Sequence, residues 1–109
     1  MDKIKVIICP TNSAPYVAHI SNTLQSLQCI VGGPIEAVGI LEGIVAICNE
    51  EGRIIGLPEN KSFLCDGIRG DCIICGTQGE EFADLNDIAC ERLLIHCKRR
   101  WKMRRETDD

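Results

Sequence analysis

The sequence has few aromatic residues and no long hydrophobic run. Phe, Trp and Tyr make up only 4% of its 109 residues, so aliphatic side chains must build the core. Its apolar stretches are far shorter than the roughly 20 residues that a membrane-spanning helix needs. Asp2, Lys3 and Lys5 place charge at the start of the chain, which is not typical of a signal peptide. We therefore expect no membrane contact.

Histidine is also scarce, and the sequence predicts no catalytic group. The two histidines, His19 and His96, have no companion residues that indicate a nucleophile with its base. No pair of carboxylates has a spacing that indicates general acid–base catalysis. We therefore predict that the protein is not an enzyme.

Cysteine, in contrast, is abundant, with eight residues. Several of them lie in aliphatic segments, as Cys9 and Cys48 do, where a reduced thiol packs as a small hydrophobe. Disulfide frameworks belong mainly to small secreted domains. We therefore expect reduced thiols and a cytoplasmic location.

The segment from Cys72 to Gly76 has a Cys-x-x-Cys-Gly pattern, which raises the alternative of a zinc site. Side chains three positions apart on a regular strand point to opposite faces of a sheet, so both thiols of this segment reach one metal only if the chain turns there. We predict buried thiols, no metal and no cofactor. Other ligands of such a site would come from Cys65, Cys90, His96 or Cys97.

The net charge of −4 is unevenly distributed along the chain. Residues 1–97 hold 6 basic and 13 acidic side chains, which gives −7, whereas residues 98–109 hold 6 basic and 3 acidic, which gives +3. We expect a single α+β domain over 1–97 and a basic C-terminal helix extension with an acidic tail over 98–109. Trp101 and its basic neighbours are compatible with phosphate contacts, but an acidic body makes nucleic-acid binding unexpected.

Hydrophobic periodicity predicts an α+β fold. Apolar, β-branched segments between turn residues indicate strands, and apolar residues recurring every three to four positions indicate helices. Because the strands come before the main helix, we expect a small antiparallel sheet with one short helix and a long C-terminal helix packed on one side. The predicted strands are 3–9, 15–20, 35–41, 44–49, 53–57 and 71–76; 77–80 is a loop, and the helices are 23–30, capped by Ser21 or Asn22, and 83–102, capped by Asp84 or Asn86.

Three ordered motifs stand out in the sequence: Leu27-Gln28-Cys29-Ile30-Val31-Gly32-Gly33-Pro34-Ile35-Glu36, Asn49-Glu50-Glu51-Gly52 and Gly56-Leu57-Pro58-Glu59-Asn60, followed by Gly70-Asp71 and an apolar strand. Together they resemble the motifs of a known family of short proteins of unknown function from phages, plasmids and their bacterial hosts. The resemblance covers roughly residues 3–95, and it implies a phage or mobile-element origin and little chemistry. The cysteines of the last strand and the basic extension depart from the family pattern.

Polar loop residues within these motifs are the candidate ligand contacts, because loops on a rigid scaffold commonly bind ligands. Asn49 and Asn60 each offer a donor and an acceptor that can read a base edge or a ribose. Turn chemistry is the alternative role for the residues around them. The predicted ligand-binding residues are Gln28, Glu36, Asn49, Glu50, Leu57, Pro58 and Asn60.

These features predict a non-catalytic accessory protein of a phage or mobile element. We expect it to bind and sequester a small nucleotide-like ligand, such as a host immune signal, in the host cytoplasm if it is phage-encoded. The alternative is a protein-interaction module that inhibits or modulates a host protein. We also expect a homo-oligomer, because one thin domain encloses little of a ligand.

Overall fold

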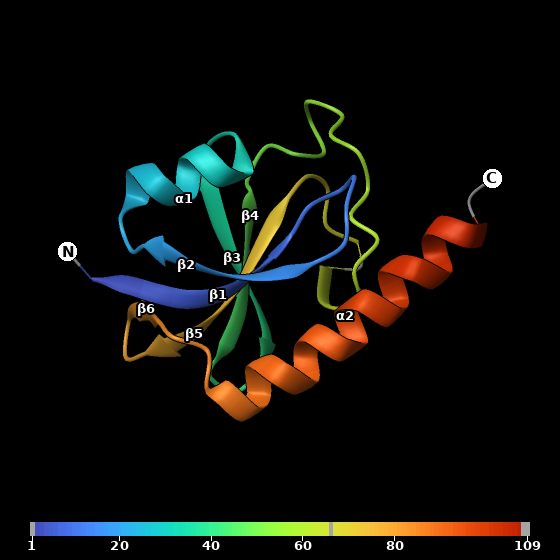
Figure 1. Cartoon of the computed structure of the whole chain (residues 1–109). Coiled ribbons are helices and arrows are strands. Elements are labelled where there is room, and N and C mark those ends of the chain that lie inside the picture. Colours follow the sequence, from blue (N-terminus) through green and yellow to red (C-terminus); the bar gives the residue numbers. More distant parts are fainter. Residues whose placement is uncertain (1, 66, 108–109) are drawn as a thin grey trace.

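A computed structural model describes residues 2–65 and 67–107. It contains one sheet, two α-helices and a short 3₁₀ helix (Figure 1). In chain order the elements are β1 (Lys3–Cys9), β2 (Tyr16–Ser21), α1 (Leu24–Val31), β3 (Ile35–Leu41), β4 (Ile44–Asn49), η1 (Phe63–Cys65), β5 (Cys72–Gln78), β6 (Glu81–Ala83) and α2 (Asp87–Thr107).

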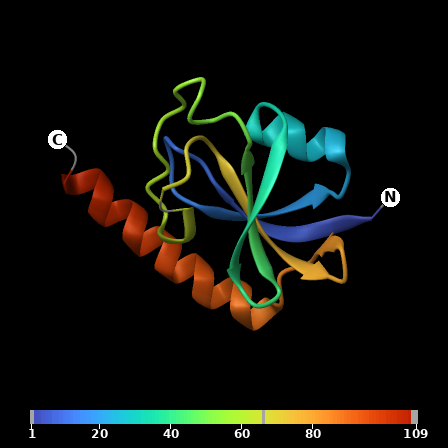
Figure 2. The same cartoon turned by 180° about the vertical axis from the view of Figure 1, so that it is seen from behind.

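The sheet is antiparallel, with strand order β2-β1-β5-β4-β3 and β6 paired to the end of β5. β5 enters between the two hairpins, so that Ile73 lies beside both Ile8 and Ile47. The residues of β5 from Cys72 to Gly76 are buried. The last long strand is therefore the centre of the sheet (Figure 2).

The two faces of the sheet support two separate cores, because successive side chains of a strand point to opposite faces. On one face Ile4, Val6 and Ile8 pack with Leu27 and Val31 of α1. The other face packs against α2, with which Ile7, Ile74, Leu85, Cys90 and Cys97 form a cluster. The predicted α+β class is confirmed, and the helices lie on opposite faces (Figure 1), which the order of the elements did not indicate.

Each helix begins at a polar cap. Thr23 Oγ1 accepts a hydrogen bond from Ser26 N, so the cap of α1 is Thr23 and not Ser21 or Asn22. The Asn86 side chain accepts from the Ile88 and Ala89 amides at the start of α2, as predicted. α2 then continues past the expected end at residue 102 to Thr107, and Arg104 forms an ion pair with Glu59.

Two predicted elements are wrong. Residues 53–56 form turns and Leu57 is irregular instead of forming a strand, because β5 occupies the place beside β4 and leaves no partner for them. Ile54 there is 86% exposed. Residues 77–80 are not a loop throughout, since β5 extends to Gln78 and pairs with β6 after a tight turn.

The expectation that all thiols are reduced is also corrected. A disulfide joins Cys65, at the end of η1, to Cys72, at the start of β5, because the intervening loop returns to the same edge of the core. The six other cysteines are free. Within the described residues, no helix is both long enough and apolar enough to span a membrane.

Candidate functional site

A groove of about 520 Å³ lies where β3 and β4 meet the long loop between β4 and β5. Glu36, Val38 and Cys48 form its sheet side, on the same face of the sheet that α2 covers. The loop supplies the opposite wall. The loop residues that line the groove are Glu50, Gly52, Arg53, Ile54, Gly67, Ile68 and Arg69, and Asn49 lies at the junction of strand and loop.

Close packing of two loop segments forms the wall of this groove. Gly52 is buried, and a Cβ atom at this position would lie 2.8 Å from the Arg69 carbonyl oxygen. No real Cβ approaches a carbonyl that closely, so only glycine allows residues 50–57 to pack on residues 67–70. Close packing therefore explains why the last position of the Asn-Glu-Glu-Gly motif is a glycine.

Two arginines bring positive charge to the groove. Arg53 Nη2 donates a hydrogen bond to the Gly67 carbonyl (3.1 Å), and Arg69 Nη1 donates to the Leu57 carbonyl (3.2 Å). These bonds tie the two loop segments together and use one guanidinium nitrogen of each side chain. A guanidinium has five N–H donors, so each arginine keeps donors that can face a ligand.

Three predicted residues, Glu36, Asn49 and Glu50, come together in the groove. The Asn49 side chain is mostly committed to the scaffold: its Nδ2 donates to the Val31 carbonyl at the end of α1, and its Oδ1 accepts from the Glu51 amide. Glu36 and Glu50 are exposed. The two glutamates therefore offer free acceptor groups to a ligand, and Asn49 positions the loop.

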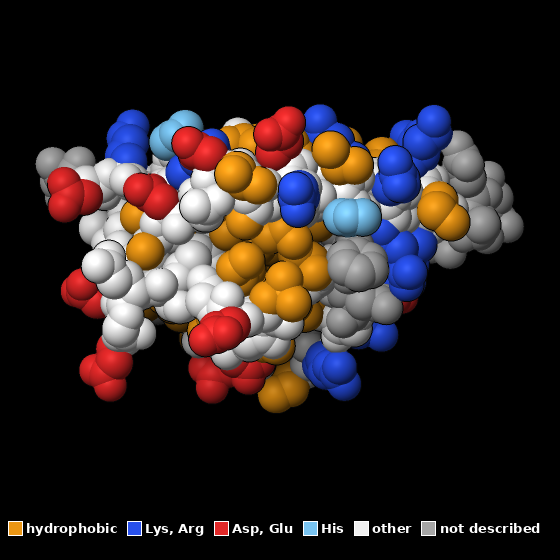
Figure 3. All heavy atoms as spheres, turned by 90° about the horizontal axis from the view of Figure 1, so that it is seen from below, with side chains coloured by type: hydrophobic (Ala, Val, Ile, Leu, Met, Phe, Trp, Pro, Cys, Tyr) orange, Lys and Arg blue, Asp and Glu red, His pale blue; other side chains and the backbone are white. Residues whose placement is uncertain are grey.

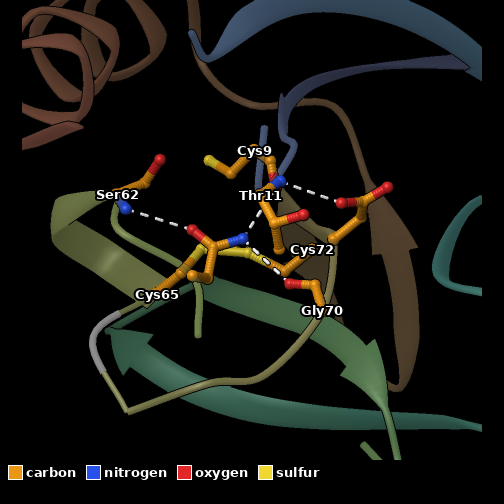
Figure 4. The surroundings of a disulfide bond; sticks show 8 residues. Cys9, Thr11, Ser62, Cys65, Gly70 and Cys72 are labelled. Carbon is orange, nitrogen blue, oxygen red and sulfur yellow. Dashed lines mark hydrogen bonds between the residues drawn. A yellow bond between two sulfur atoms is a disulfide. The ribbon is translucent and has the colours of Figure 1, made fainter. Parts of the chain in front are cut away.

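Asn60 lies elsewhere and is fully buried. Its Nδ2 donates to the carbonyls of Cys9 (2.8 Å) and Gly70 (2.9 Å), and its Oδ1 accepts from the Ser62 amide (Figure 4). All of these partners are backbone groups. Asn60 thus holds the loop between β4 and β5 against the end of β1, and a ligand-binding role for it stays a prediction.

The three remaining predicted residues also lie outside the groove. Leu57 and Pro58 line a smaller depression of about 250 Å³ beside Gly32 at the end of α1. Gln28 is half-buried on α1, where its carbonyl accepts from the Gly32 and Gly33 amides. The structure therefore separates the predicted residues into the groove, this depression, α1 and the buried Asn60.

Cys48 is the groove-lining residue with nucleophilic character, but it is poorly activated. Burial and then the nearby Glu36 charge raise the pKa of its thiol. A raised pKa keeps the thiol protonated, whereas a reactive cysteine needs the thiolate. The groove is thus better suited to binding than to covalent chemistry.

Sequence reasoning missed the two arginines and the apolar wall of Val38, Ile54 and Ile68. Arg53 and Ile54 lie in a segment whose apolar pattern predicts a strand, and no local pattern indicates that Arg69 returns beside them. The length of the loop is the one local signal of a functional segment, since long loops in compact domains are commonly functional.

Hydrophobic side chains form an exposed patch on the side of the molecule that Figure 3 shows. Lys and Arg side chains gather toward the C-terminal end of α2 in this view, and Asp and Glu toward the other end. The partly buried hydrophobic residues that pack on the α2-side core are Ile40, Ile44, Leu64, Ile68, Leu93 and Leu94.

A family model described as a domain of unknown function (DUF3846) matches residues 4–97. The match spans nearly the whole stretch over which the sequence motifs predicted a family of unknown function. No curated protein and no solved structure matches the chain.

Proposed function

We propose that this chain, which belongs to the DUF3846 family of unknown function, binds a small nucleotide-like ligand in the β3–β4 groove and releases it unaltered. In this proposal the protein sequesters the ligand in the cytoplasm as an accessory protein of a phage or other mobile element. The ligand of such a protein would be a host signalling molecule.

The observation that carries the proposal is the meeting of Arg53 and Arg69 with an apolar wall in one groove. Guanidinium groups bind phosphate oxygens with charge-assisted hydrogen bonds. Val38 and Ile68 offer an apolar surface for the face of a base. A volume of about 520 Å³ is within the range of small-molecule sites.

The acidic residues fit the remaining groups of such a ligand. Glu36 and Glu50 can accept hydrogen bonds from ribose hydroxyls or from an exocyclic amine of a base. They would also repel a ligand that places phosphates on their side of the groove. The proposal therefore predicts one orientation, with phosphate at the arginines and sugar or base at the glutamates.

Isothermal titration calorimetry of the purified chain with a panel of linear and cyclic nucleotides tests this function. We expect Arg53→Ala and Arg69→Ala each to weaken binding about tenfold or more, since a hydrogen bond to a charged group contributes about 1.5–3 kcal/mol. Arg92→Ala is the matched control, because Arg92 is exposed on α2 and does not line the groove.

Equal affinity of the two groove variants and wild type would contradict the assignment of the groove. Circular dichroism of each variant shows whether the fold is retained, since both arginines also bond to loop carbonyls.

The exposed hydrophobic patch favours a second candidate, a protein-interaction module that modulates a host protein (Figure 3). This candidate predicts that Ile95→Lys on α2, where the Ile95 side chain is exposed, abolishes the biological effect, while Arg53→Ala leaves it unchanged. The ligand-binding proposal instead predicts that Arg53→Ala abolishes the biological effect and that the α2 variant leaves it unchanged. A phage-infection or growth assay in the host distinguishes the two.

A further inference from the structure

Four cysteines from four separate elements meet at the α2-side core. Cys9 ends β1, Cys65 ends η1, Cys72 begins β5 and Cys97 lies in the middle of α2. All four are buried and belong to one cluster. Such a convergence is not needed for packing alone, because leucine or valine would fill the same core.

The sulfur atoms of Cys9, Cys65 and Cys72 lie within 4.8 Å of one another (Figure 4). In a tetrahedral zinc site with Zn–S bonds of about 2.3 Å, neighbouring sulfurs are about 3.8 Å apart. The Cα atoms of Cys65 and Cys72 are 7.0 Å apart, slightly beyond the roughly 4.4–6.8 Å that is usual for a disulfide. This spacing suits two ligands of one ion.

Cys97 provides the fourth sulfur. It is fully buried in the same core cluster as Cys9, Cys65 and Cys72. Its helix, α2, packs against η1, which carries Cys65. Cys97 therefore approaches the three grouped sulfurs from the helix side.

Polar groups around the sulfurs fit an anionic cluster. The Ser62 hydroxyl is buried and makes no hydrogen bond of ordinary geometry among the described residues. It points toward the Cys9 sulfur (Figure 4). This hydroxyl can donate a hydrogen bond to a metal-bound thiolate.

We propose that Cys9, Cys65, Cys72 and Cys97 bind one zinc ion as a tetrathiolate site when the protein is reduced. A dithiol reductant first supplies two electrons and two protons, which convert the Cys65–Cys72 disulfide into two thiols. Binding of Zn²⁺ then releases four protons and forms four Zn–S bonds. Four sulfur ligands in tetrahedral arrangement select zinc among the common divalent ions.

This inference departs from the prediction of no metal, and it does not depend on the proposed ligand. The Cys-x-x-Cys segment contributes only one ligand, because Cys75 points to the opposite face and packs in the α1-side core. Cys9 was not among the ligands considered from sequence. The site would fasten η1 and α2 to the sheet and so fix the loop that forms the groove wall.

The test is metal analysis of the full chain purified under reducing conditions without chelators. We expect one zinc per chain by elemental mass spectrometry. Cobalt substitution should give the visible absorption of a tetrahedral thiolate complex. Cys9→Ser and Cys97→Ser should each abolish the stoichiometric metal, and Ser62→Ala should weaken metal binding about tenfold.

Cys75→Ser is the matched control, since Cys75 is equally buried and lies on the same strand as Cys72. It should retain the metal. If the serine variants fail to fold, cobalt titration of the reduced wild-type chain decides, because the intensity of the thiolate-to-cobalt absorption reports the number of sulfur ligands. Reduced protein that binds no metal, or that binds metal without thiolate absorption, would overturn the site.

Discussion

At the scale of single residues, Asn60 is the side chain on which the loop between β4 and β5 depends most directly. It bonds to three buried backbone groups, those of Cys9, Ser62 and Gly70. We expect Asn60→Ala to lower the free energy of unfolding by at least about 2 kcal/mol, because these groups would lose their partners without reaching water. Urea denaturation followed by circular dichroism measures this change.

Asn12→Ala serves as the control for Asn60→Ala, because Asn12 is an exposed loop asparagine. It should change stability by no more than about 0.5 kcal/mol. Equal stability of the two variants would mean that the Asn60 hydrogen bonds do not hold the loop.

Cys75 gives the stability a pH dependence. Burial raises the pKa of its thiol to about 12 in the folded chain, from an ordinary value near 9. Above pH 9 the unfolded chain therefore loses this proton while the folded chain keeps it, so folding stability falls as the pH rises toward 12. At pH 10 the loss from this thiol is about 1.4 kcal/mol.

Comparison with Cys75→Ala isolates this effect. Between pH 7 and pH 10, wild type should lose about 1.4 kcal/mol more unfolding free energy than the variant. Parallel losses in the two proteins would show that the Cys75 thiol titrates equally in both states.

At the scale of elements, Gly52 determines how closely the two loop segments pack. A methyl group there would meet the Arg69 carbonyl, so we expect Gly52→Ala to cost about 1–3 kcal/mol of unfolding free energy and to weaken ligand binding by displacing the wall of the groove. Thermal denaturation and calorimetric titration measure the two effects.

Gly39→Ala is the contrasting change, because a Cβ atom at Gly39 in β3 would meet no atom within 4 Å. It should leave stability unchanged or raise it by up to about 1 kcal/mol. Equal behaviour of the two alanine variants would contradict the close packing at Gly52.

The sequence predicted most elements correctly because local periodicity determines them. β1, β3 and β4 have the predicted bounds, and α1 ends at Val31, one residue past its predicted end. The segment 53–57 was misassigned because its apolar residues resemble a strand, whereas the competing β5 lies later in the chain. Strand order is a long-range property that local patterns do not contain.

Only the part of the candidate site that lies near the strand ends could be predicted from the sequence. Glu36, Asn49 and Glu50 belong to recognisable motifs, and they do come together in the groove. Arg69 enters the groove through a loop that returns from a distant part of the sequence, and no periodicity marks such a return. The four-cysteine cluster likewise depends on η1 and α2 meeting β1 and β5.

At the scale of the whole molecule, β2 and β3 are the outer strands of the main sheet. Most side chains of β3 are exposed, and this strand also forms one side of the groove. An open edge strand is a template for pairing with another chain. The expected homo-oligomer would thus deepen the groove if it formed through β3, and light scattering should give a mass above the 12.0 kDa of one chain.

Native mass spectrometry of the chain, after incubation with cell extract and a nucleotide panel, is the decisive test of ligand sequestration in the groove. We expect a discrete added mass on wild type that is lost in Arg53→Ala and kept in Arg92→Ala, and that is released unaltered on denaturation. An added mass that survives in Arg53→Ala, an altered product, or no added mass with any sample would contradict ligand sequestration in the groove.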